Sequence, residues 1–202
     1  MKKVILINGS PHSNGTTAFA LNVVANSLGD NGVDSEILQV GHMALRGCTA
    51  CCSCLETKRC AYDDGLNEIA ARVHASDGLV VGSPVYYAGV NGTVKSFLDR
   101  LFYSGTGKFR FKPAAAVVAM RRAGGTAALQ TINQYFEFAE MLITPTMYWS
   151  GIHGLNGEQA ATDEEGVQMM EVIGRNMAYL LEIQSKSKIP EPVKKVKTNF
   201  IR

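Results

Sequence analysis

Short strand-like segments alternate along this chain with segments that repeat apolar residues at the 3.6-residue period of a helix. The strand-like segments, most of them continuously apolar, span residues 3–8, 34–40, 78–82, 114–120 and 146–149. The helical segments span residues 17–28, 64–74, 90–101, 126–141 and 164–183. Strands that are buried on both faces lack the polar alternation of a half-exposed sheet. The pattern therefore predicts an α/β fold with a doubly wound, five-stranded parallel sheet and helices on both faces.

A single domain, residues 1–184, accounts for the whole alternation, because no linker or internal repeat interrupts it. Residues 185–202 lose the periodicity and are expected to form a basic C-terminal arm or tail, which ends in the apolar pair Phe200-Ile201. Of the 20 Lys and Arg and the 18 Asp and Glu, this tail contains six and one, which leaves 14 basic and 17 acidic side chains in the domain. A basic groove for nucleic acid is therefore not indicated.

The expected setting is the cytoplasm, without membrane contact. No apolar run approaches the ~20 residues that a membrane span needs. Met1-Lys2-Lys3 leads directly into a strand, and no signal-peptide cleavage pattern follows. Five cysteines in a reducing cytoplasm stay reduced unless they bind metal.

The joint between the first strand and the first helix, Asn8 to Thr17, combines glycines, hydroxyls and an amide with no acid and no lysine. Glycines let backbone N–H groups point inward, and a helix start adds free N–H groups and partial positive charge. This combination predicts a cradle for a phosphate monoester, although an ordinary helix-capping loop remains open. The candidate ligands of the phosphate are Ser10, His12, Asn14, Gly15, Thr16 and Thr17. The joint lacks the lysine of a mononucleotide P-loop, and Pro11 replaces the second glycine of a dinucleotide fingerprint.

Two further loops follow buried strands, and in an open parallel sheet ligands bind beyond the carboxyl ends of the strands. The loop after the third strand has a fixed turn, two aromatic rings and a small Ala-Gly step, which suit a flat ring: Pro84, Val85, Tyr86, Tyr87, Ala88 and Gly89. The loop after the fourth strand has two cations and glycine N–H groups, which suit a ring edge that becomes anionic: Arg121, Arg122, Gly124 and Gly125. A phosphate cradle, a flat slot and an electropositive edge together predict a site for flavin mononucleotide (FMN).

Gly9–Thr17, Gly82–Tyr87, Lys95–Arg100, Arg121–Gly125 and the pair Tyr148-Trp149 resemble the flavodoxin-like NAD(P)H-dependent FMN reductases, and within them the iron–sulfur flavoproteins. The resemblance covers residues 3 to 184 and implies the strand order 2-1-3-4-5. It implies an FMN phosphate held by the first loop, an isoalloxazine ring between the other two, and a homodimer or homotetramer. One departure is His12, where these enzymes often carry Arg or Lys, which leaves backbone donors to hold the phosphate.

Four cysteines, Cys48, Cys51, Cys54 and Cys60, follow the spacing C-x2-C-x2-C-x5-C, and Cys52 is an additional thiol. Ligands this closely spaced wrap a compact inorganic core, whereas zinc sites more often use two separated pairs. The spacing is similar to the motif of the iron–sulfur flavoproteins, which implies a 4Fe–4S cluster. Free thiols that are a relic of a cluster-binding ancestor remain an alternative.

The sequence predicts an FMN-dependent oxidoreductase that takes electrons from NAD(P)H as co-substrate and passes them to a small acceptor, a flavin or a quinone. No catalytic side chain is expected, because the flavin carries the chemistry. Tyr86, Tyr87 and Arg122 are the expected neighbours of the reactive ring. One alternative is an iron–sulfur electron-transfer flavoprotein without direct NAD(P)H chemistry, for which a ferredoxin is a partner. A second is a non-enzymatic thiol or flavin redox sensor, which the adjacent Cys51 and Cys52 would suit.

Overall fold

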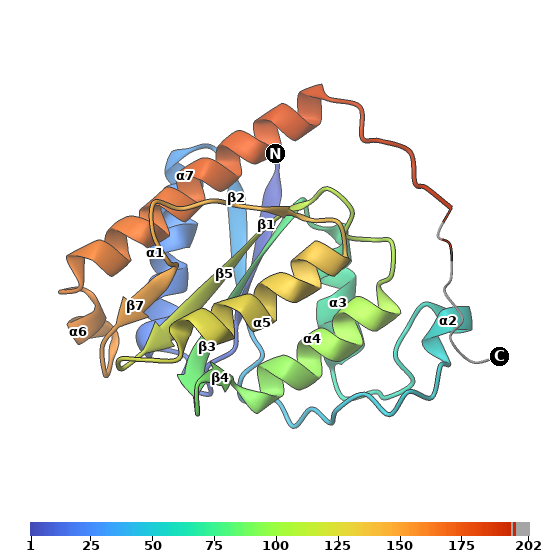
Figure 1. Ribbon diagram of the computed structural model, residues 1–202, viewed down its shortest axis with the longest axis horizontal. Helices are drawn as coiled ribbons and strands as arrows, with labels where there is room; N and C mark the ends of the chain where they lie inside the picture. Colours follow the sequence, from blue (N-terminus) through green and yellow to red (C-terminus); the bar gives the residue numbers. More distant parts are fainter. Residues whose placement is uncertain (195, 197–202) are drawn as a thin grey trace.

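The computed structural model describes residues 1–194 and 196. Phe200 and Ile201, the predicted apolar end of the tail, lie outside the described residues. Figure 1 shows a central sheet with helices packed on both faces, as expected for a doubly wound α/β domain. Among the described residues, no helix is long and apolar enough to cross a membrane.

Within the described residues the sheet has seven strands, and five of them are parallel neighbours in the order β2-β1-β3-β5-β6. The strands are β1 (Lys3–Asn8), β2 (Asp34–Gln39), β3 (Gly78–Tyr86), β4 (Gly89–Val90), β5 (Pro113–Met120), β6 (Leu142–Ile143) and β7 (Gly151–His153). Strand β4 pairs antiparallel with β3, and β7 pairs parallel with β5. The first four parallel positions match the predicted order 2-1-3-4, and the fifth is shared by two short strands.

The predicted fifth strand, residues 146–149, is wrong. These residues form the connection between β6 and β7, and Met147, Tyr148 and Trp149 are each about 60% exposed. Strand β6 pairs with the first residues of β5, and β7 pairs with its last three. Two short strands, β6 and β7, therefore share the outer edge of β5. The aromatic residues that suggested a strand lie in the solvent-exposed segment between them.

The five predicted helices are present, with ends shifted by up to three residues. They are α1 (Thr16–Asp30), α3 (Leu66–Ala75), α4 (Gly92–Ser104), α5 (Gly125–Phe138) and α7 (Glu164–Lys186). Two helices of a single turn, α2 (Cys54–Thr57) and α6 (Gly157–Ala160), were not predicted. They are too short to show a 3.6-residue period, so the pattern could not indicate them.

Side chains of β1 alternate between two apolar cores, one on each face of the sheet. Val4 and Leu6 lie in the core that α1 and α7 cover. Ile5 and Ile7 lie in the core that α3, α4 and α5 cover, together with Phe97. Complete burial of such a side chain contributes about 1.5–3 kcal/mol. These cores hold the strand ends, and thus the loops beyond them, in fixed positions.

Gly41, just after β2, lies directly against the loop that follows β1. Its N–H donates to the carbonyl oxygen of Asn8 at 3.0 Å. A Cβ atom at this position would lie 2.2 Å from the carbonyl carbon and oxygen of Ser10 and 2.3 Å from the oxygen of Gly9. These are backbone atoms that cannot rotate away, so only glycine fits at this position. The close contact supports the loop that follows β1.

Gly41→Ala should lower the free energy of unfolding by about 1–3 kcal/mol, because the added methyl group overpacks backbone atoms. Gly29→Ala is the matched control. Gly29 lies in the last turn of α1 with no atom within 4 Å of an added Cβ, so this change should stabilise the protein by about 0.5 kcal/mol. Urea unfolding measures both changes. Equal stability of the two variants would contradict the close approach.

Candidate functional site

The loop between β1 and α1 is a compact turn held by hydrogen bonds of its own. The N–H of Gly9 donates to the oxygen of Gly82 at 2.8 Å, which extends the β1–β3 ladder past the end of β1. The N–H of Ser10 donates to Oδ1 of Asn8 at 3.1 Å, and the N–H of His12 donates to Oγ of Ser10 at 3.1 Å. Ser10 is buried, whereas the side chain of His12 is exposed.

Helix α1 begins beside this turn without a side-chain cap. Its N-cap residue is Gly15, so the first N–H groups of the helix have no side-chain acceptor. The Thr16 hydroxyl donates to the oxygen of Gly154 at 3.0 Å, and its proton is already used. The Thr17 hydroxyl makes no hydrogen bond within the part of the chain that the structure describes. Uncapped N–H groups, a free hydroxyl and the positive end of the helix fit a phosphate group. Asn14, the remaining candidate, is exposed.

Strands β3 and β4 form a tight hairpin beyond the carboxyl edge of the sheet, where Val85 pairs with Val90 and Tyr86 pairs with Gly89. The two turn residues, Tyr87 and Ala88, have φ angles of +47° and +59°. Left-handed backbone costs a non-glycine residue about 1–2 kcal/mol, and strain of this kind collects at functional sites. The turn leaves the Tyr87 side chain fully exposed and Tyr86 about half exposed.

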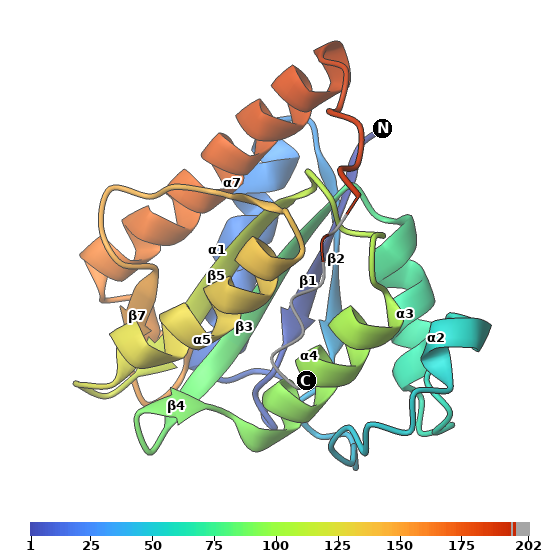
Figure 2. The ribbon, with the colours of Figure 1, turned by 45° about the vertical axis from the view of Figure 1, so that its right-hand side comes forward.

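The loop between β5 and α5 touches this hairpin. Gly124 has a φ of +94°, and a Cβ atom there would lie 2.6 Å from Cα of Ala88. Figure 2 shows β4 below the sheet, beside the first turn of α5. Arg121 and Arg122 are exposed, and among the described residues neither has an ion-pair partner. The second and third predicted loops are thus in contact, with two free cations at their edge.

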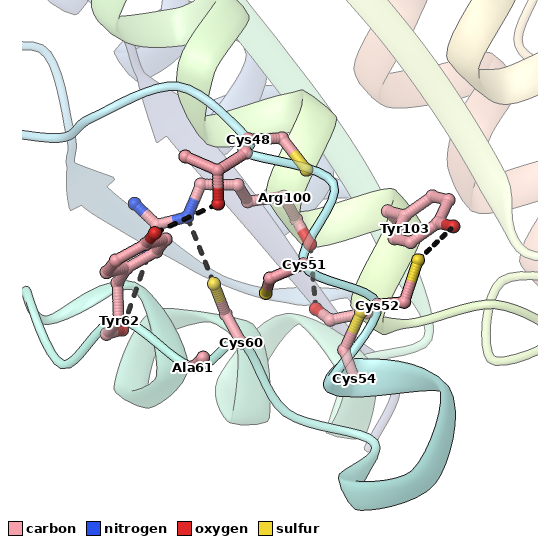
Figure 3. Close-up of a pocket in the computed structure, with 11 residues that line it drawn as sticks. Cys48, Cys51, Cys52, Cys54, Cys60, Ala61, Tyr62, Arg100 and Tyr103 are labelled. Carbon is pink, nitrogen blue, oxygen red and sulfur yellow. Dashed lines mark hydrogen bonds between the residues drawn. The ribbon is translucent and has the colours of Figure 1, made fainter.

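All five cysteine side chains line one pocket in the connection between β2 and α3 (Figure 3). Tyr62, Arg100 and Tyr103 are among the other residues that line it. Burial raises the pKa of the Cys54 thiol, and the nearby thiols of the other three predicted ligands raise it further. Among the described residues, no group of three or more side chains is arranged to hold a single metal ion. A four-iron cluster differs from a single ion because each thiolate binds a separate iron, and four thiols around one pocket fit that donor set.

The connection carries three left-handed residues that are not glycine: Ala50, Cys52 and Lys58. Such conformations persist only where surrounding contacts over-determine them. The end of this connection is held by α4, where the buried Arg100 forms a bidentate ion pair with Asp64. The distances are 2.6 Å from Nη1 to Oδ2 and 2.8 Å from Nη2 to Oδ1. The Arg100 guanidinium holds the pKa of the Asp64 carboxyl below its usual value.

A model of the family "NADPH-dependent FMN reductase" matches residues 2–154, which is more than half of the chain. The chain belongs to this family. An iron–sulfur flavoprotein of Methanocaldococcus jannaschii is 28% identical over 192 residues, which cover 91% of this chain and 100% of the relative. A second iron–sulfur flavoprotein of that organism is 30% identical over 183 residues, which cover 83% of this chain and 91% of the relative. These relatives place the chain in the iron–sulfur flavoprotein branch of the family.

A solved flavodoxin from the domain Archaea superimposes with a TM-score of 0.59 at 16% identity, over 90% of this chain and 99% of the flavodoxin. It supports the flavodoxin-like fold alone. Membership of the FMN reductase family establishes flavin-dependent oxidoreduction, with FMN as the flavin of the family.

Two features of the site were not predicted from the sequence of this family member. The misplaced fifth strand hid the turn at Gly154, which follows β7 and accepts the Thr16 hydroxyl proton. Arg100 was named only as the last residue of the Lys95–Arg100 stretch, with no role of its own. Its position offered a signal, because it lies one turn from Phe97 and from Ser104 on the buried side of α4. A charged residue on an apolar stripe indicates a buried partner.

Asp64→Asn should destabilise the protein by about 3 kcal/mol, because it leaves a buried guanidinium without its counter-charge. Glu182→Gln is the control: the Lys186–Glu182 pair is mostly exposed, so its loss should leave the free energy of unfolding close to that of wild type. The folded pKa of Asp64 lies below its usual value of 3.8. The ion pair is therefore fully stabilising above about pH 4 and is lost as the pH falls through the folded pKa. Urea unfolding at several pH values should show the gap between wild type and Asp64→Asn closing in acid.

Proposed function

We propose that this protein is an FMN-dependent oxidoreductase that takes electrons from NAD(P)H and passes them to a small acceptor, a flavin or a quinone. The observation that carries the proposal is the meeting of three loops at the carboxyl edge of β1, β3 and β5, beside an uncapped helix start. In open α/β sheets this edge is where ligands bind.

The chain offers a complementary group for each part of FMN. The N–H groups of Thr16 and Thr17, the Thr17 hydroxyl and the Ser10 turn would hold the terminal phosphate. His12 and Asn14, both exposed, lie on the outer rim of the same turn. A flavin bound here would supply hydride acceptance and single-electron transfer.

The ring end of the flavin would lie between the hairpin and the β5–α5 loop. The hairpin, Pro84 to Gly89, would present backbone and the half-exposed Tyr86 to a flat ring. The loop Arg121 to Gly125 offers N–H groups and two unpaired cations, which stabilise negative charge on a ring edge. Ala88 and Gly124 bring these two walls into contact.

Thr17→Val should weaken FMN binding about tenfold or more, because it keeps the shape of the side chain but removes one hydrogen bond to a charged group, worth about 1.5–3 kcal/mol. Quenching of flavin fluorescence measures the dissociation constant. Thr131→Val is the control, because the Thr131 hydroxyl donates to the oxygen of Ala127 within α5. FMN affinity that is the same in wild type and Thr17→Val would exclude the start of α1 as the phosphate site.

A second function is supported by the five thiols around one pocket. Cys48, Cys51, Cys54 and Cys60 would hold a 4Fe–4S cluster, which supplies single-electron transfer. In that case the protein could receive electrons from a carrier such as ferredoxin rather than from a nicotinamide. Five free thiols suit a reducing setting such as the cytoplasm.

Reduction under anaerobic conditions separates these two functions. If the protein reacts with nicotinamides, NADH or NADPH should bleach the bound FMN rapidly, and a quinone or free flavin should restore the colour. A pure electron-transfer protein would keep its colour with nicotinamide and lose it with reduced ferredoxin or dithionite. Free FMN mixed with the same nicotinamide gives the background rate. Bleaching by ferredoxin or dithionite alone would overturn the NAD(P)H assignment.

We also propose that the protein assembles as a homodimer or homotetramer. Tyr87, Tyr148 and Trp149 are large side chains that are each more than half exposed, and a second copy of the chain could cover them. Light scattering tests this assembly. A monomer at micromolar concentration would contradict it.

A further inference from the structure

The buried Arg100 side chain contacts both ends of the cysteine-bearing segment, which we call the cysteine loop, residues 46–64. Nη1 donates to the oxygen of Arg46 at 3.2 Å, just before the first cysteine. Nη2 donates to the oxygen of Tyr62 at 3.3 Å, and Nε donates to Sγ of Cys60 at 3.2 Å. Together with the two bonds to Asp64, every nitrogen of the guanidinium has a partner.

Through these contacts the guanidinium links the beginning of the cysteine loop to its end. The planar fork of arginine offers five N–H donors in fixed directions, which lysine cannot reproduce. Only 1% of the Arg100 side chain is exposed, so each unsatisfied donor would carry a desolvation cost. The Tyr62 ring also lies near two cations: its centroid is 4.4 Å from the guanidinium carbon of Arg46 and 5.5 Å from that of Arg100. The beginning and the end of the loop are thus fastened to one point on α4.

The ion pair with Asp64 does not account for the position of the Nε–H group of Arg100. Asp64 uses only Nη1 and Nη2, whereas Nε is directed at the Cys60 sulfur (Figure 3). Sulfur is a weak acceptor when it is a neutral thiol and a strong one when it carries negative charge. A buried cation beside that sulfur therefore suits a loop that holds an anionic group.

We infer that Arg100 is a positioning residue: it closes the cysteine loop, presents the Cys60 sulfur to the pocket and supplies positive charge beside the iron–sulfur group. The charge part rests on the cluster of the proposed function. Hydrogen bonds to the sulfurs and nearby positive charge stabilise the more negative, reduced state of such a group. Arg100 therefore raises its reduction potential, which favours uptake of an electron at this end of the molecule.

The test compares wild type with Arg100→Gln, which removes the charge, and Arg100→Lys, which keeps the charge but loses the fork. Lys95→Gln is the matched control, because Lys95 lies on the same helix in an exposed pair with Asp99. Each protein is measured in two states. Amide hydrogen exchange over residues 46–64 is followed in the metal-free protein, and iron content and midpoint potential follow anaerobic reconstitution with iron and sulfide.

Arg100→Gln should exchange the amides of the cysteine loop at least tenfold faster than wild type. The iron that it retains should have a lower midpoint potential, by about 59 mV for a tenfold loss of electron affinity in a one-electron couple. Arg100→Lys should lose loop protection but shift the potential less, and Lys95→Gln should match wild type. A residue with only a structural role would lower iron content without moving the potential of the iron that remains.

Loop exchange and potential in both Arg100 variants equal to wild type would overturn the inference. If wild type takes up no iron, the cluster and the charge part of the proposal are both refuted, and amide exchange alone decides whether Arg100 closes the loop. If Arg100→Gln does not fold, amide exchange and midpoint potential are measured in Arg100→Lys instead.

Discussion

The parallel register of β1, β3 and β5 is the constraint on which both candidate sites depend. Asn8 lies beside Gly82, and Gly82 lies beside Val117, so the three strands end at one edge of the sheet. The bond from the Gly9 N–H to the Gly82 oxygen carries the ladder one residue further, into the first loop. Loops that are far apart in the sequence therefore meet because of backbone hydrogen bonds, before any side chain acts.

Helix α4 connects the two sites physically. At its start, Asn91 follows the hairpin, and its side chain accepts the N–H of Thr93 at 2.7 Å as a helix cap. Nine residues later, about 14 Å along the helix axis, Arg100 holds the cysteine loop. The helix is anchored between these points by Val94, Phe97, Leu98 and Leu101, all fully buried. A rigid element thus fixes how the hairpin and the cysteines lie relative to each other.

Local patterns predicted those parts of the fold that depend on burial along a single segment. β1 was predicted residue for residue, and the five long helices were found near their observed ends, because continuous apolar runs and 3.6-residue stripes report burial directly. The strand predicted at Tyr148 and Trp149 was wrong, because aromatic residues suggest a strand even where they face solvent. Contacts between residues far apart in the sequence could not be predicted from local patterns either. Nothing local shows that Arg100 meets Cys60, 40 positions earlier, or that Gly41 supports Ser10.

We propose that one chain carries two electron carriers, FMN at the carboxyl edge of the sheet and an iron–sulfur cluster in the cysteine loop. An anaerobic reductive titration with dithionite, after reconstitution with FMN, iron and sulfide, tests it most directly. The account predicts about three electrons per chain, two on the flavin and one on the cluster. An end point at about two electrons, with only the flavin spectrum changing, would contradict it.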